Sequence, residues 1–127
     1  MKKVILIEDN EDMLNLLDVI VKEANFQVFL FKEAKKAYES LQSIRPDLII
    51  CDLLMPEYNG LNFLKQIKSD PDFKTVPVII ISVVVERFLI DEVMSAGADA
   101  FFHKPFRVIE LIDIINKYLG VGKNESK

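Results

Sequence analysis

Acidic, hydroxyl and amine side chains stand at the ends of four short apolar runs in this sequence. The first run is followed by Glu8 and Asp9, another by Asp52, another by Ser82, and the last lies two residues before Lys104. Any one of these residues alone would most simply solvate a loop or cap a helix. Their repetition at matching places favours one site that gathers carboxylates, a hydroxyl and an ammonium group.

The charges of this group predict what it can bind. Two carboxylates about 6 Å apart repel by roughly 3 kcal/mol at an effective dielectric near 20. Three of them cannot all stay ionised at neutral pH without a nearby cation or raised pKa values. Lys104 offsets one charge, and Mg²⁺, which prefers oxygen ligands, is the simplest further cation. A metal ion, an ammonium group and a hydroxyl are suited to neutralise and orient a phosphoryl group.

Five apolar runs are predicted to be the strands that position these side chains. Continuous rather than alternating runs of this length are typical of strands buried on both faces of a parallel sheet. Segments with apolar residues at steps of three and four separate and follow the runs, which indicates helices. Such alternation predicts an α/β doubly wound domain, in which ligands bind beyond the carboxyl ends of the strands. The predicted strands are Val4–Ile7, Val28–Phe31, Leu48–Cys51, Val76–Ile81 and Ala100–Phe102, and the predicted helices cover 13–24, 33–44, 61–69, 86–96 and 108–119.

Length and composition bound the class of protein. The chain has 127 residues, 50% of them hydrophobic and 28% charged, which suits one domain with its own core. Its single cysteine excludes an internal disulfide and a thiolate metal cluster. No apolar run is long enough for a membrane span or a secretory leader, and the net charge of −4 argues against a large nucleic-acid interface. We expect a cytoplasmic domain at 1–120 and a short solvated tail at 121–127, with no output domain, membrane contact or direct nucleic-acid contact.

Four stretches of the sequence carry more specific information. They are VILIEDNE at the first predicted strand, LIICDLLMPEYNG at the third, VIIIS at the fourth and GADAFFHKPF at the fifth. In combination they resemble the response regulator receiver domains of two-component signalling, the CheY-like family. The resemblance covers residues 2–120 without an evident gap. It implies a flavodoxin-like (βα)₅ fold with a five-stranded parallel sheet in the order 2-1-3-4-5.

The resemblance implies an acceptor and a set of metal ligands. Asp52 would accept a phosphoryl group from a histidine kinase or a histidine phosphotransfer protein. Mg²⁺ would be bound by Asp9 directly, by Glu8 through water, by Asp52, and by the backbone carbonyl of Leu54. The chemistry would be in-line phosphoryl transfer, in which positioning and charge neutralisation do most of the work.

The resemblance also implies how the phosphoryl group would be sensed. Ser82 and Lys104 would bind its oxygens, and Phe101 would be the aromatic side chain that turns when Ser82 moves. Pro105 would follow Lys104 through a peptide bond that is often cis in the family. The surface of the fourth helix, fifth strand and fifth helix would then change and bind a downstream target or a second copy. The protein would be a switch that assists only its own phosphorylation and dephosphorylation, and not an enzyme in the usual sense.

Three apolar residues depart from the usual pattern of the family beside the predicted site. Val83 stands directly after Ser82, where a small residue is usual, and Leu54 and Val84 stand two residues beyond Asp52 and Ser82. These side chains cannot hold a hydrolytic water by hydrogen bonding. We expect them to tune access to the site and the lifetime of the phosphoryl group, with slow self-dephosphorylation. Crowding of the site, which would slow phosphorylation as well, is the alternative.

Three rival functions remain for this sequence. A degenerate receiver that binds partners without phosphorylation is the main alternative, although Asp9, Asp52 and Lys104 are all present. A phosphohydrolase of the haloacid-dehalogenase type would need an aspartate where Leu54 stands. A flavodoxin-like flavin carrier would need a phosphate loop rich in Ser, Thr and Gly where the acidic stretch EDNED stands.

Overall fold

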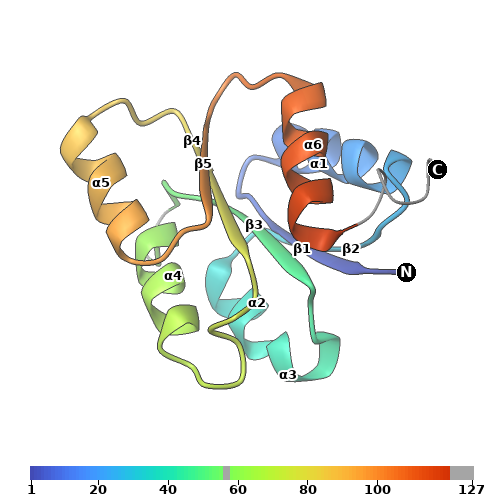
Figure 1. Cartoon of the computed structure of the whole chain (residues 1–127), viewed down its shortest axis with the longest axis horizontal. Coiled ribbons are helices and arrows are strands. Elements are labelled where there is room, and N and C mark those ends of the chain that lie inside the picture. The colour runs from blue at the N-terminus through green and yellow to red at the C-terminus, as the bar shows by residue number, and fades with distance from the viewer. Residues whose placement is uncertain (56–57, 121–127) are drawn as a thin grey trace.

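The structure is a computed structural model that describes residues 1–55 and 58–120. Strands and helices alternate along these residues (Figure 1). In chain order they are β1 (Lys3–Ile7), α1 (Glu11–Glu23), β2 (Gln27–Phe31), α2 (Ala34–Glu39), α3 (Leu41–Ile44), β3 (Leu48–Asp52), α4 (Gly60–Lys68), β4 (Val78–Ser82), α5 (Arg87–Ser95), β5 (Ala100–His103) and α6 (Val108–Leu119).

The five strands form one parallel sheet with the order β2-β1-β3-β4-β5. This order confirms the predicted doubly wound fold. The register pairs Ile7 with Cys51, Asp52 with Ile81, and Ser82 with His103. The carboxyl ends of β1, β3, β4 and β5 are therefore level at one edge of the sheet, over which the loops after β4 and β5 arch at the top of Figure 1.

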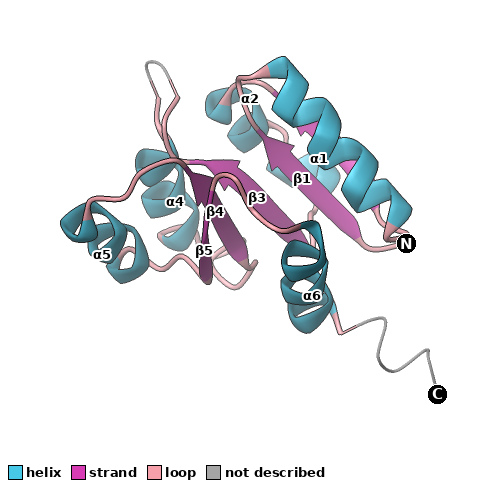
Figure 2. Ribbon diagram, turned by 90° about the horizontal axis from the view of Figure 1, so that it is seen from above, coloured by secondary structure: helices cyan, strands magenta, loops and turns pink. Residues whose placement is uncertain are grey.

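Helices cover both faces of the sheet (Figure 2). On one face, strand residues such as Ile49 pack with α2, α3, α4 and α5 in one hydrophobic cluster. On the other, strand residues such as Ile50 pack with α1 and α6 in a second cluster. Every residue of β3 and β4 is buried, which is why these strands read as continuous apolar runs rather than as alternating ones.

Two predicted elements have different bounds in the structure. The helix predicted at 33–44 is divided at Ser40, whose hydroxyl donates to the carbonyl of Lys36 and so competes with the helical backbone bonds. The fourth strand begins at Val78 and not at Val76, because Pro77 has no N–H to donate to a ladder. Since α2 and α3 together replace one predicted helix, the predicted fourth and fifth helices are α5 and α6.

The predicted tail at 121–127 lies outside the described residues, so the division of the chain at residue 120 stays a prediction. None of the helices in the described ranges combines the length and the apolar character that a membrane crossing requires.

Candidate functional site

Four polar side chains of the predicted site meet at the carboxyl edge of the sheet. Glu8 follows β1, Asp52 ends β3, Ser82 ends β4, and Lys104 follows β5. Glu8, Asp52 and Ser82 are 1%, 7% and 0% exposed, and they are the buried polar residues among those that the structure describes. Burying such groups is costly unless they are paired, so their gathering indicates a site and not a solvated loop.

Lys104 connects two of the buried carboxylates. Its Nζ lies 2.7 Å from Oε1 of Glu8 and 3.4 Å from Oδ2 of Asp52. The second oxygen of Glu8 accepts a hydrogen bond from the backbone N–H of Asn10 at 3.1 Å. These contacts fix the orientation of Glu8 and bring one positive charge to the site, as the sequence predicted for Lys104.

Three carboxylates form an oxygen-only group at the same edge. One oxygen from each of Glu8, Asp9 and Asp52 lies within 4.8 Å of the others, and Asp9 is exposed to solvent. Among the residues that the structure describes, Lys104 is the basic side chain paired with these three acids, so a negative charge remains. Oxygen donors, excess negative charge and one open side fit Mg²⁺, which keeps several of its waters when bound.

The environment of Asp52 disfavours its ionised form. Burial, and after it the nearby charge of Glu8, raise the pKa of this carboxyl from 3.8 to about 6, although the charge of Lys104 opposes both. A cation bound at the acidic group would favour the ionised carboxylate that can attack a phosphorus atom.

The raised pKa predicts that Asp52 destabilises the fold at neutral pH. The pKa is above the unfolded value, so the Asp52 carboxyl costs the fold no stability below about pH 4, and its cost grows as the pH rises to about 6. The difference between the folded and unfolded pKa values corresponds to at most roughly 3 kcal/mol. We expect Asp52→Asn to be about 1–3 kcal/mol more stable than the wild type at pH 7 without Mg²⁺, as measured by urea unfolding.

The difference between the two proteins should shrink when the same measurement is made near pH 4. Asp91→Asn is the matched control, because Asp91 is an exposed residue of α5 whose carboxylate pairs with the exposed Arg87. A gain in stability that is equal at both pH values would contradict this account of Asp52.

The end of β3 is held in place by the start of α4. The N–H of Leu53 donates to the carbonyl of Ile81 at 3.2 Å, and the N–H of Gly60 donates to the carbonyl of Leu53 at 2.9 Å. A side chain on Gly60 would place its Cβ 2.4 Å from the carbonyl oxygen of Asp52. The close approach of the two backbones therefore requires glycine at this position, a requirement that the sequence analysis missed and that only the motif LIICDLLMPEYNG hinted at.

The three apolar residues predicted beside the site differ in exposure. Leu54 and Val83 are 49% and 60% exposed, whereas Val84 is buried and packs in the cluster that faces α2–α5. The N–H of Leu54 lies 3.4 Å from Oδ1 of Asp52, a long contact. The roles predicted for these three side chains, and for the carbonyl of Leu54 as a metal ligand, stay predictions.

The predicted switch residue Phe101 lies on β5, beyond β4 from Asp52. Its side chain is half-buried and packs against the cluster under α5. The ring of His103 meets it edge to face, with centroids 5.5 Å apart and an interplanar angle of 84°. The peptide bond between Lys104 and Pro105 is cis, as the resemblance implied. His103 is the last residue of β5.

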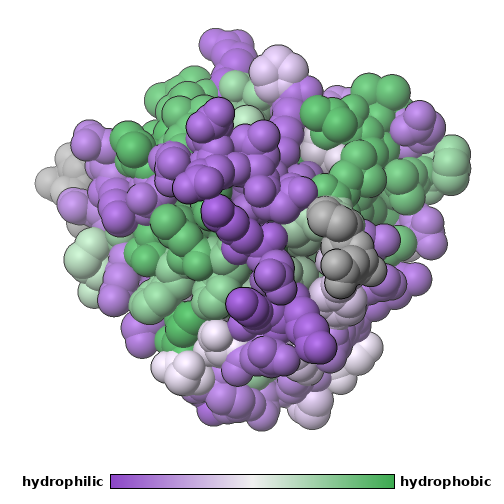
Figure 3. Space-filling model, turned by 180° about the vertical axis from the view of Figure 1, so that it is seen from behind, coloured by the Kyte–Doolittle hydropathy of each residue, from purple (hydrophilic) through white to green (hydrophobic). Residues whose placement is uncertain are grey.

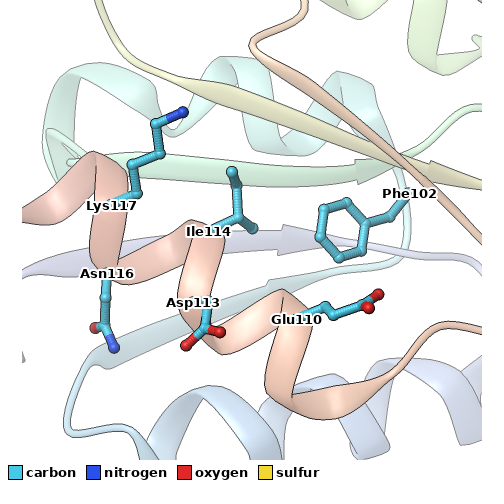
Figure 4. Close-up of a pocket in the computed structure, with 6 residues that line it drawn as sticks. All are labelled: Phe102, Glu110, Asp113, Ile114, Asn116 and Lys117. Atoms are coloured by element: carbon cyan, nitrogen blue, oxygen red, sulfur yellow. The ribbon is translucent and has the colours of Figure 1, made fainter.

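The surface carries two further features: exposed hydrophobic residues at α5, and a cavity between β5 and α6. Hydrophobic surface gathers at the upper right of Figure 3, on the side of α5, and Val85 and Phe88 are exposed where this helix begins. A separate cavity of about 500 Å³ lies between β5 and α6, and Phe102 points toward α6 there (Figure 4). It is lined by Phe102, Glu110, Asp113, Ile114, Asn116 and Lys117, and so includes none of the three acids of the candidate site.

Comparison with known protein families identifies the family of this chain. Residues 4–116 match the model of the response regulator receiver domain. The chain belongs to this family. It is therefore a receiver domain of two-component signalling, a family of signalling proteins and not of classical enzymes.

Individual relatives of this receiver domain agree with the assignment. The polar-differentiation response regulator DivK of Brucella anthropi is 29% identical over 119 residues, which cover 94% of this chain and 97% of DivK. Protein RcaC of Microchaete diplosiphon is 28% identical over 117 residues, which cover 92% of this chain but only 18% of RcaC. The chain thus spans less than a fifth of one relative and nearly all of the other.

Solved structures share the fold. The receiver domain of a signal transduction histidine kinase from Syntrophus aciditrophicus has a TM-score of 0.89 and 29% identity, with 94% of this chain and 91% of that one covered. The phosphorylated cyanobacterial phytochrome response regulator RcpA has a TM-score of 0.79 and 26% identity, with 91% and 89% covered. A receiver domain of a sensor histidine kinase from Pseudomonas aeruginosa PAO1, which holds magnesium in its active-site cleft, has a TM-score of 0.86 and 22% identity, with 94% and 98% covered.

Proposed function

We propose that this receiver domain is a phosphorylation-activated switch whose acceptor is Asp52. The observation that carries the proposal is the buried Asp52 carboxylate, which shares Lys104 with Glu8 and lies within 4.8 Å of two further acids. The donor would be the phosphohistidine of a kinase or of a phosphotransfer protein. The carboxylate would attack the phosphorus atom, the bond from phosphorus to the histidine nitrogen would break, and the phosphoryl group would remain on Asp52 as a mixed anhydride.

In this mechanism the residues of the chain have separate tasks. Asp9, Glu8 and Asp52 would hold Mg²⁺, which supplies charge neutralisation on the phosphoryl oxygens when bound. Lys104 would pair with a phosphoryl oxygen in place of part of its contact with the carboxylates. The hydroxyl of Ser82, now accepting a bond from the N–H of Val84 at 3.2 Å, keeps its own proton free to donate to a phosphoryl oxygen.

The phosphorylated switch would act on its partner through the surface formed by α5, β5 and α6. Support comes from exposed apolar residues on these elements, such as Phe88 and Ile109, and from the cavity between β5 and α6. A downstream protein or a second copy of the domain would bind there. We propose a cytoplasmic location, since the histidine kinases that would supply the phosphoryl group act on receivers there.

Mass spectrometry of the intact protein tests the proposed function. Incubation with acetyl phosphate and Mg²⁺ should add a phosphate-sized mass, and chelation of the metal should prevent the increase. The adduct should be removed by hydroxylamine near neutral pH, as expected of an acyl phosphate and not of a phosphoserine. No increase in the presence of Mg²⁺ would favour the degenerate receiver, which binds partners without phosphorylation.

The exposed Leu54 side chain predicts a long-lived phosphoryl group. An apolar group at the mouth of the site cannot orient the water that hydrolyses the anhydride, whereas an amide can. We expect Leu54→Asn to accelerate phosphate loss by roughly three- to tenfold, because one oriented hydrogen bond contributes about 1 kcal/mol. The rate of loss is measured as phosphate released from the phosphorylated protein after the phosphoryl donor has been removed.

The matched control for this variant is Leu54→Met, which keeps an apolar side chain of similar volume at the same place. Its rate of phosphate loss should stay close to that of the wild type. An unchanged or slower loss in Leu54→Asn would show that Leu54 does not set the lifetime.

A further inference from the structure

The single histidine of the chain connects two parts that the proposed switch would move. The Nε2 atom of His103 lies at hydrogen-bonding distance from the carbonyl oxygen of Val84, in the loop between β4 and α5. The same imidazole ring meets the ring of Phe101 edge to face. His103 therefore touches the loop that follows Ser82 and also the predicted switch aromatic.

The strand order predicts how a movement of the loop after Ser82 would affect its contact with His103. β4 lies between β3, which carries Asp52, and β5, which carries His103. In the proposed switch, the loop after Ser82 would move toward a phosphoryl group on Asp52, and therefore toward β3 and away from β5. That movement would lengthen the contact between the carbonyl of Val84 and His103.

The other bonds of the loop do not oppose this movement in the same way. The N–H of Val84 donates to the hydroxyl of Ser82, which belongs to the same moving segment. The N–H of Lys104 donates to the backbone carbonyl of Ser82 at 2.9 Å, which continues the pairing of β4 with β5. The bond from His103 is the side-chain bond that joins β5 to the loop beyond Ser82 among the described residues.

We propose that His103 is a positioning residue that holds the β4–α5 loop and Phe101 in the unphosphorylated arrangement. This inference rests on the proposed function, because it concerns the regulation of the same site. A carbonyl oxygen only accepts hydrogen bonds, so the Nε2 atom must carry the proton and donate. Removing the donor while keeping a ring next to Phe101 should shift the population toward the phosphoryl-bound arrangement.

Binding of a phosphoryl mimic tests this proposal. The apparent affinity for beryllium fluoride is measured at saturating Mg²⁺ and one mildly alkaline pH, from amide shifts in ¹⁵N-labelled protein. His103→Phe, which keeps a ring and loses the donor, should bind the mimic roughly two- to tenfold more tightly than the wild type, the range expected for one net hydrogen bond. His103→Gln, which keeps an amide donor, should bind within about twofold of the wild type.

Separate outcomes distinguish the two proposals. If His103→Phe binds no more tightly than the wild type, or if His103→Gln binds as tightly as His103→Phe, the positioning role of His103 is overturned and the proposed function stands. If the wild type does not bind the mimic, the proposed function fails and the positioning role of His103 fails with it.

The tautomer of His103 supplies a second test that needs no variant. Long-range ¹⁵N–¹H correlation spectra of the unphosphorylated wild type should show the proton on Nε2, and the imidazole shifts should change when the mimic binds. A proton on Nδ1 in the free protein, or imidazole shifts unaffected by the mimic, would overturn the proposal.

Discussion

Asp52→Asn is expected to abolish phosphoryl uptake from acetyl phosphate to the detection limit of intact-mass measurements. The amide has no anionic oxygen to attack phosphorus, and the neighbouring acids do not replace it. Glu8 is already engaged by Lys104 and by the backbone of Asn10. Asp9 is exposed, and so lacks the enclosed position that Asp52 has beside Lys104.

Two measurements separate loss of the acceptor from loss of the fold. The circular dichroism spectrum of Asp52→Asn should match that of the wild type, and its stability at pH 7 should be higher, since the variant removes a buried charge. Asp91→Asn, on the exposed face of α5, should take up phosphate as the wild type does. Uptake by Asp52→Asn at the wild-type rate would mean that another residue is the acceptor.

Gly60→Ala is expected to destabilise the domain by about 2–4 kcal/mol and to slow phosphorylation as well. The added Cβ would lie 2.4 Å from the carbonyl oxygen of Asp52 and 2.9 Å from the Cα of Leu53, and both neighbours are backbone atoms. The clash cannot be relieved by turning a side chain. Either α4 moves away from β3, or the acceptor strand shifts and carries Asp52 with it.

Urea unfolding and the rate of phosphate uptake measure the two effects. Asn62→Ala on the same helix is the matched control, because Asn62 is exposed and alanine keeps the backbone N–H that donates to the capping side chain of Asn59. Its stability and its uptake should stay close to those of the wild type. A Gly60→Ala variant as stable as Asn62→Ala would show that the approach of α4 to β3 is looser than described.

Local sequence patterns were sufficient to predict the type and order of nearly all elements. Continuous apolar runs predicted buried parallel strands, and β3 and β4 are buried along their whole length. The errors fell where a short-range effect competed with the pattern. The hydroxyl of Ser40 bonds back to Lys36 and divides a helix, and Pro77 delays the start of β4.

The meeting of the strand-end side chains could be predicted from the sequence, but the pKa of Asp52 could not. Residues at strand ends were expected to meet because parallel strands end at one edge of a sheet. The pKa of Asp52 depends on the depth of burial and on distances to Glu8 and Lys104, which a pattern of residue types does not contain. The requirement for glycine at position 60 likewise depends on how closely α4 approaches β3.

By itself the sequence determined the fold class, the edge of the sheet where the acids gather, and the family that the motifs resemble. Only the tertiary structure decided which atoms touch: Lys104 reaches Glu8 across 96 residues, and His103 reaches the loop after β4. The physical reason is the sequence separation over which the two kinds of interaction act. Periodicity and turn chemistry act within a few residues, whereas contacts between side chains from different strands depend on register, helix approach and packing of the whole sheet.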